Sequence, residues 1–149
     1  MAGLKRNMVI DASVVMKWFI QEKDRDRALM LREKHVRGER LLLAPDLLAY
    51  EVCDSLRYNP EFTDGDVRDA VKALFELHLG LSSPTIRDMD KASENAFKYD
   101  ITVYDASYLS LADLEESSLI TADEKLYEKV KENPLVVLLS SDKFLQIII

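Results

Sequence analysis

The sequence predicts an α/β fold in which a parallel sheet of about five strands lies between two layers of helices. Short apolar runs alternate with segments of helical periodicity along the 149-residue chain. Each helical segment is long enough to carry the chain back to the start of a neighbouring parallel strand. There is no internal repeat or linker, so we expect one domain over residues 1–149, arranged as a three-layer α/β/α sandwich.

The expected strands are short apolar runs, which are typical of strands buried on both faces of a sheet. The first of them ends at Asp11, and the second ends just before Pro45. The third is the least regular, because it begins with polar residues. The predicted strands are 7–10, 41–44, 82–86, 118–121 and 135–139.

The expected helices have recognisable start and stop signals. Gly38 is a plausible C-terminal cap, Pro45 opens a helix, and Pro60 follows the end of that helix. Thr63 caps the next helix, and Gly80 closes it. The predicted helices are 14–20, 24–36, 45–58, 63–79, 88–99, 103–114 and 123–131.

The composition excludes several classes of protein. One cysteine cannot form an internal disulfide, and no apolar run approaches the roughly 18 residues of a membrane span, so we expect a cytoplasmic protein with no membrane association. The net charge of −7 argues against broad attraction to nucleic acid. A polyanionic substrate would therefore need metal ions or a local basic patch to offset this charge.

The chain ends in an apolar stretch from Phe144 to Ile149. A free apolar terminus favours aggregation. We expect this stretch to be covered, either by the rest of the chain or by a partner.

Four acidic residues are predicted to meet at one edge of the sheet. Asp11 ends the first strand, and Asp123 lies two residues beyond the end of the fourth. Glu51 and Asp105 lie on helices that start from the same edge. Ligands of parallel sheets bind outside the carboxyl ends of the strands, which is where these acids would converge.

Each acid also has a simpler structural interpretation. Asp11 or Ser13 could cap the helix that follows the first strand. Asp105 could complement a helix dipole, and Thr121 could cap a helix in a capping box with Glu124. The functional hypothesis therefore depends on the four acids sharing an edge, and not on any one of them.

Clustered carboxylates indicate a divalent cation, because they repel one another unless they are protonated or neutralised. Mg²⁺ takes oxygen ligands and needs only a few carboxylates. Bound metal ions can activate water and stabilise both oxygens during phosphodiester cleavage. The only histidines, His35 and His78, lie on different helices, and Cys53 stands alone, so a zinc site or a cysteine nucleophile is not expected.

Four sequence motifs, in order, resemble those of PIN-domain ribonucleases, and most of all the small VapC-like toxins of toxin–antitoxin pairs. The resemblance in their order and spacing extends over nearly the whole chain, from Val9 to about Leu139. The matching runs are VIDASV from Val9, PDLLAYEV from Pro45, VYDASYLSLA from Val103 and LITAD from Leu119.

The resemblance implies a three-layer PIN-like sandwich and Mg²⁺- or Mn²⁺-dependent endonucleolytic cleavage of RNA. Asp11, Glu51 and Asp105 would bind metal directly or through water, and Asp123 would act through water or position a second ion. The resemblance also implies a homodimer and a small antitoxin that blocks the acidic site. The implied supporting hydroxyls are those of Ser13 and Thr121.

One position departs from the family pattern. Many relatives carry Asn three residues after the helical Glu, where this chain has Asp54. An ionised Asp cannot donate a hydrogen bond and adds negative charge. We therefore leave Asp54 outside the predicted core of the site.

Three other interpretations of the chain remain as alternatives. A receiver-type signalling domain also has a parallel sheet and an acidic pocket, but its paired acids are missing here, because Ala12 follows Asp11. An Asp-x-Asp phosphohydrolase would need Asp where this chain has Ser13. A PIN-like fold could also bind RNA or protein without cleaving it, and metal-dependent cleavage would separate that module from the enzyme.

Overall fold

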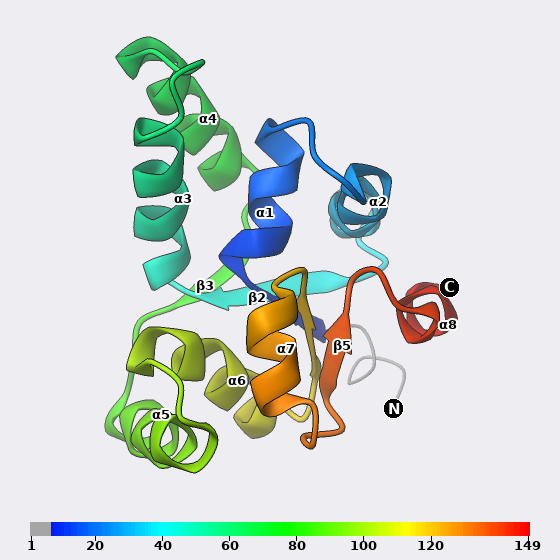
Figure 1. The fold of residues 1–149 in the computed structure, drawn as a ribbon. Coiled ribbons are helices and arrows are strands. Elements are labelled where there is room, and N and C mark those ends of the chain that lie inside the picture. The colour runs from blue at the N-terminus through cyan, green and yellow to red at the C-terminus, as the bar shows by residue number, and fades with distance from the viewer. Residues whose placement is uncertain (1–6) are drawn as a thin grey trace.

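The computed structural model describes residues 7–149, so the first six residues of the expected domain lie outside it. Five strands and eight helices follow one another along this part of the chain (Figure 1). In order they are β1 (Asn7–Ile10), α1 (Ala12–Phe19), α2 (Arg25–Val36), β2 (Leu41–Pro45), α3 (Leu47–Arg57), α4 (Asp64–Glu76), β3 (Gly80–Ser82), α5 (Ile86–Tyr99), α6 (Val103–Glu115), β4 (Ser118–Thr121), α7 (Glu124–Val130), β5 (Val136–Leu138) and α8 (Asp142–Ile148).

The five strands form one parallel sheet in the order β3-β2-β1-β4-β5. Val9 of β1 is in register with Leu43 of β2 on one side and with Leu119 of β4 on the other. The central strand is buried on both faces, which explains why it reads as a continuous apolar run. Chain order reverses between β1 and β4, so the carboxyl ends of these two strands form the switch point where such sheets hold ligands.

Helices cover both faces of the sheet. The connections from β1 through β2 to β3 carry α1–α4 over one face, and those from β3 through β4 to β5 carry α5–α7 over the other, as right-handed crossovers require (Figure 1). Helix α6 packs against β1, β2 and β4. The expected three-layer α/β/α sandwich is therefore confirmed.

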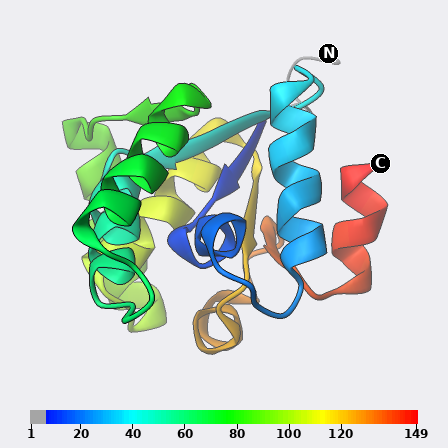
Figure 2. The same cartoon turned by 90° about the horizontal axis from the view of Figure 1, so that it is seen from above.

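The apolar C-terminal stretch forms α8, a helix that the sequence analysis did not anticipate. Ser141 caps the helix, and its hydroxyl accepts a hydrogen bond from the Phe144 backbone N–H over 3.2 Å. Phe144 and Ile148 are buried, and α8 lies alongside α2 (Figure 2). The Arg27 guanidinium donates hydrogen bonds to the carbonyls of Leu139 and Ser141 just before this helix. The chain itself therefore covers most of its apolar end.

The predicted third strand was wrong in its position. Strand β3 begins at Gly80, which was expected to close a helix, and ends at Ser82, before Pro84, which lacks a backbone N–H. A Cβ at Gly80 would lie 2.5 Å from the end of the Leu43 side chain, so any other residue here would require that side chain to move. Helix α4 ends earlier than predicted, because His78 adopts a left-handed backbone conformation with φ 52°.

No helix within residues 7–149 has both the length and the apolar character to cross a bilayer.

Candidate active site

Asp11 lies at the carboxyl end of β1, where the chain turns into α1. Its carboxylate caps α1 by accepting a hydrogen bond from the Val14 N–H over 3.4 Å. The side chains of Ser13 and Thr121 also donate hydrogen bonds to it, each over 2.5 Å. Asp11 is only 6% exposed. Its three hydrogen bonds hold it in one orientation at the switch point of the sheet.

The two hydroxyls that hold Asp11 also join β1 to the turn after β4. Ser13 Oγ accepts a hydrogen bond from the Ala122 N–H over 2.8 Å, and Thr121 Oγ1 accepts one from the Asp123 N–H over 3.1 Å. Each hydroxyl therefore donates to the carboxylate and accepts from the backbone. The structure thus places both predicted supporting residues against Asp11.

Glu51 approaches from α3 and is held by a residue that the sequence analysis assigned to packing. The Tyr108 hydroxyl on α6 donates a 2.5 Å hydrogen bond to Glu51 Oε1. The Tyr108 ring is buried, whereas Glu51 is partly exposed. The available signal was that Tyr108 follows Asp105 by three residues, which places both on one face of α6.

Glu51 and Asp105 both line an open cleft of about 520 Å³. Asp105 lies in the first turn of α6, which Thr102 caps by accepting a hydrogen bond from the Asp105 N–H over 3.0 Å. Asp54 also lines this cleft. The residue that we left outside the predicted core is therefore adjacent to two of its members.

Asp123 lies in the turn after β4 and is exposed. Its carboxylate caps α7 by accepting a hydrogen bond from the Leu126 N–H over 3.0 Å. The alternative interpretation, a capping box with Thr121 as the cap, is excluded. Thr121 belongs to β4, where it pairs with Leu138, and its hydroxyl donates to Asp11, so Asp123 itself supports the start of the helix.

The four acids affect one another electrostatically. Burial raises the pKa of the Asp11 carboxyl to about 6, with a smaller contribution from the Asp123 charge. Burial also raises the pKa values of Glu51 and Asp105, and repulsion by Asp105 and by Asp123, respectively, adds to each shift. Lys129 opposes the shift of the Asp105 pKa only in part. The arrangement therefore favours a cation that would neutralise several carboxylates at once.

The chemistry of these side chains fits a hard divalent cation. All four acids offer oxygen ligands, and Mg²⁺ is commonly held by one or two carboxylates together with water. A carboxylate has about four lone-pair sites, so the contacts of Asp11 leave room for a cation. Within residues 7–149, however, no three His, Cys, Asp or Glu side chains are close enough to enclose one ion.

Comparison with known proteins agrees with this architecture. Residues 8–132 match the model of the PIN domain family. Ribonuclease VapC3 of Pyrobaculum aerophilum is 29% identical over 126 residues, which cover 82% of this chain and 93% of that protein.

Solved structures share the fold at low sequence identity. The crystal structure of PAE2754 from Pyrobaculum aerophilum superposes with a TM-score of 0.68 at 18% identity, covering 99% of this chain and 92% of that one. A toxin–antitoxin complex from Klebsiella pneumoniae gives a TM-score of 0.67 at 16% identity, covering 90% and 98%. The strand order places the acids of this chain at the switch point of the sheet. Because the family model also spans most of the sequence, the chain belongs to the PIN domain family.

Proposed function

We propose that this protein is an endoribonuclease that hydrolyses RNA phosphodiester bonds with Mg²⁺ or Mn²⁺, and that it is the toxin of a toxin–antitoxin pair. The observation that carries the proposal is the buried Asp11 carboxylate at the end of β1, which is held by two hydroxyls and is close enough to Asp123 for the two charges to repel. The similarity to Ribonuclease VapC3 over most of both chains supports this activity. The receiver-type alternative is set aside, because the chain is a PIN domain.

In this proposal Asp11, Glu51 and Asp105 would bind a cation directly or through water, and Asp123 would act through water or position a second ion. When bound, the cation would supply activation of water and neutralisation of charge on the phosphate. Ser13 and Thr121 orient the Asp11 carboxylate, and the Tyr108 hydroxyl orients that of Glu51. No side chain needs to act as a nucleophile.

We also propose two protein partners. An antitoxin is supported by two neighbours of the same fold, the toxin–antitoxin complex from Klebsiella pneumoniae and VapBC2 from Rickettsia felis, solved with a promoter DNA fragment. The latter has a TM-score of 0.63 at 10% identity and covers 89% of this chain and 96% of that one. A homodimer is supported by α5, whose outer face exposes 82% of Ile86 and 89% of Phe97.

Two further features of the chain belong to the same proposal. The sheet uses strands from β1 to β5, and α8 packs back on β5 and α2, which supports one PIN domain over residues 1–149. The composition, with its single cysteine, supports the cytoplasm as its compartment.

The test is cleavage of a labelled single-stranded RNA pool by the purified protein free of any antitoxin. We expect cuts with Mn²⁺ or Mg²⁺ and none with a chelator. Asp11→Asn should reduce the rate by about a hundredfold or more, since it removes a charge from the cation site. The matched control is Asp69→Asn on the exposed side of α4, which should cleave like the parent chain.

Circular dichroism of each variant shows whether it is folded. Folded protein that cuts no RNA with either metal would favour the binding module over the enzyme. Equal cleavage by Asp11→Asn and the parent chain would remove Asp11 from the mechanism.

A further inference from the structure

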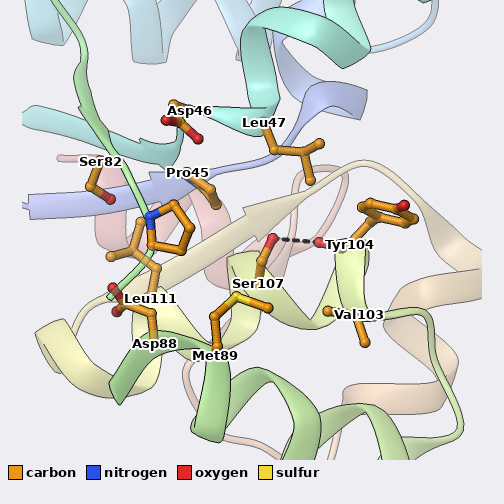
Figure 3. A pocket seen from close by; sticks show the side chains of 11 residues that line it. Pro45, Asp46, Leu47, Ser82, Asp88, Met89, Val103, Tyr104, Ser107 and Leu111 are labelled. Carbon is orange, nitrogen blue, oxygen red and sulfur yellow. Dashed lines mark hydrogen bonds between the residues drawn. The ribbon is translucent and has the colours of Figure 1, made fainter. Parts of the chain in front are cut away.

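A second hollow adjoins the acidic cleft, and Leu47 and Tyr104 line both. It has a volume of about 180 Å³ and lies between the start of α3, the end of β3 and the neighbouring sides of α5 and α6 (Figure 3). Pockets for drug-sized ligands measure about 300–1,000 Å³. This hollow therefore has room for a single ring system but not for a whole nucleotide.

The walls of the hollow are mainly apolar. Pro45, Leu47, Met89 and Leu111 line it, and the Tyr104 side chain is 64% exposed. Flat apolar walls and an accessible aromatic ring suit a planar base, because every base has a π-face for stacking. A phosphate would find no cationic partner among the lining residues.

Two carboxylates give the hollow a hydrogen-bonding preference. Asp46 and Asp88 line it on the side away from Tyr104 (Figure 3). Oδ2 of Asp46 accepts from the Ser83 hydroxyl over 2.8 Å, and Oδ2 of Asp88 accepts from the Thr85 N–H over 2.8 Å. Within residues 7–149 the Oδ1 atom of each has no partner. An ionised carboxylate only accepts hydrogen bonds, so a bound ring must supply N–H donors.

We propose that this hollow, the base pocket, holds one nucleobase beside the cleaved phosphodiester and selects a base with an amino group over uracil. The inference rests on the proposed function, because it assumes that the substrate is RNA. Guanine, adenine and cytosine each carry an amino group that can donate to a carboxylate. Uracil can donate only through N3–H, which lies between two carbonyl oxygens, so at least one of the two carboxylates would face a carbonyl oxygen and gain no donor.

The first test compares binding of two RNA octamers, oligo(C) and oligo(U). Cytosine has an amino group at C4 and an acceptor at N3, whereas uracil has a carbonyl at C4 and an N–H at N3. Fluorescence anisotropy in the Asp11→Asn background with Mg²⁺ prevents cleavage from consuming the probe. We expect oligo(C) to bind about tenfold more tightly, the discrimination that one good hydrogen-bonded pair provides. Equal binding of the two octamers would overturn the base pocket, whether or not the parent protein cleaves RNA.

Variants connect the preference to the pocket. Asp46→Asn introduces an N–H donor, and we expect the ratio of oligo(C) to oligo(U) affinity to fall to roughly threefold or less. Ser107→Phe fills the hollow and should remove the preference. The matched control is Asp90→Asn, an exposed charge on α5 that does not line the hollow, and it should keep the ratio of the parent chain.

The same variants separate the possible failures. In the active protein, sequencing the cut ends of a random RNA pool should show uracil disfavoured at one position beside the cut, and Asp46→Asn should relax this bias. RNA cleavage without any such bias would reject the base pocket and leave the proposed function standing. If Ser107→Phe changed the sedimentation of the protein but not the affinity ratio, the hollow would be a contact between two copies of the chain, and the proposal would be wrong.

Discussion

At the scale of single residues, Asp11 combines a structural role with a functional one. It caps α1, joins β1 to the turn after β4 through two hydroxyls, and faces the switch point of the sheet. A carboxylate that is buried against its own repulsive neighbours lowers the stability of the fold when ionised. The protein keeps this residue at a cost in stability, as is common at functional sites.

The first prediction concerns the pH dependence of folding stability without divalent metal. The pKa of Asp11 rises from 3.8 to about 6 on folding, so the folded chain holds a proton that the unfolded chain releases in this range. The resulting stabilisation is complete below pH 3.8 and is lost as pH rises through 6. Asp11→Asn should therefore be more stable than the parent chain at pH 8, by about 1–3 kcal/mol.

Urea unfolding at pH 4 and pH 8 with a chelator measures this difference, which should be small at pH 4, where the carboxyl is protonated in the folded chain. Equal stability of the two chains at pH 8 would contradict the raised pKa. With Mn²⁺ present at pH 8, the parent chain should gain melting temperature and the variant should gain less, because a ligand stabilises the state that binds it.

The second prediction concerns the hydroxyl that orients Glu51. Tyr108→Phe keeps the buried ring but removes the 2.5 Å hydrogen bond to Glu51 Oε1. Because this bond lowers the pKa of Glu51, its loss raises that pKa further and moves the acidic limb of the cleavage profile to higher pH. We also expect weaker Mn²⁺ binding, so that the Mn²⁺ concentration giving half of the maximal rate rises about tenfold.

Rates measured against Mn²⁺ concentration and pH test this role. The control is Tyr99→Phe, a partly buried tyrosine whose hydroxyl has no hydrogen-bond partner within residues 7–149. If the rates of Tyr108→Phe depended on pH and Mn²⁺ concentration as those of the control do, the Tyr108 hydroxyl would have no role in the reaction.

At the scale of elements, how well the sequence predicted the fold depends on how each element is stabilised. Strands β1, β2 and β4 were predictable because each is an apolar run in the middle of the sheet. Strand β3 was misplaced because it is a three-residue edge strand that begins with glycine. Helix α8 was missed because its sequence is a nearly continuous apolar run that shows no helical period, unlike the equally short α7.

The candidate site was also predicted only in part. The motifs and the switch-point rule predicted the positions of the acids, and the structure places Ser13 and Thr121 on Asp11 as expected. The hydroxyl of Tyr108 had only one signal, its spacing from Asp105, because a buried aromatic on a helix looks the same in sequence whether or not its polar end is used. The position of Asp54 in the cleft depends on how α3 packs, which a single sequence does not reveal.

The third prediction concerns α8 as an element of the core. Phe144 is fully buried and lies 6.0 Å from the Arg27 guanidinium, measured to the ring centroid. Phe144→Ala should lower the free energy of unfolding by about 3–4 kcal/mol, because it leaves a cavity in a packed region. Leu145→Ala on the exposed side of the same helix should cost less than about 1 kcal/mol. Urea unfolding compares them, and similar losses would mean that α8 is not docked in solution.

At the scale of the whole molecule, the apolar surface is not evenly distributed. The buried side of α5 contains Ala92 and Asn95, whereas its outer face exposes Ile86 and Phe97. This is the reverse of the pattern expected for a helix whose outer side faces only water. Exposed large apolar side chains that share a helix face mark interaction surfaces. A symmetric dimer would bury the same face on both copies.

The fourth prediction is that α5 forms the contact of the proposed homodimer. Ile86→Asp and Phe97→Asp should each shift the protein from dimer to monomer, because a charge buried opposite its symmetry mate has no partner. The folded monomer should lose little stability, since both positions are exposed within one chain. Phe75→Asp on α4, at another exposed aromatic, is the control and should leave the dimer intact. Sedimentation equilibrium distinguishes the outcomes. A monomeric parent chain would refute the homodimer, and a dimer that survives both α5 substitutions would place its contact on another face.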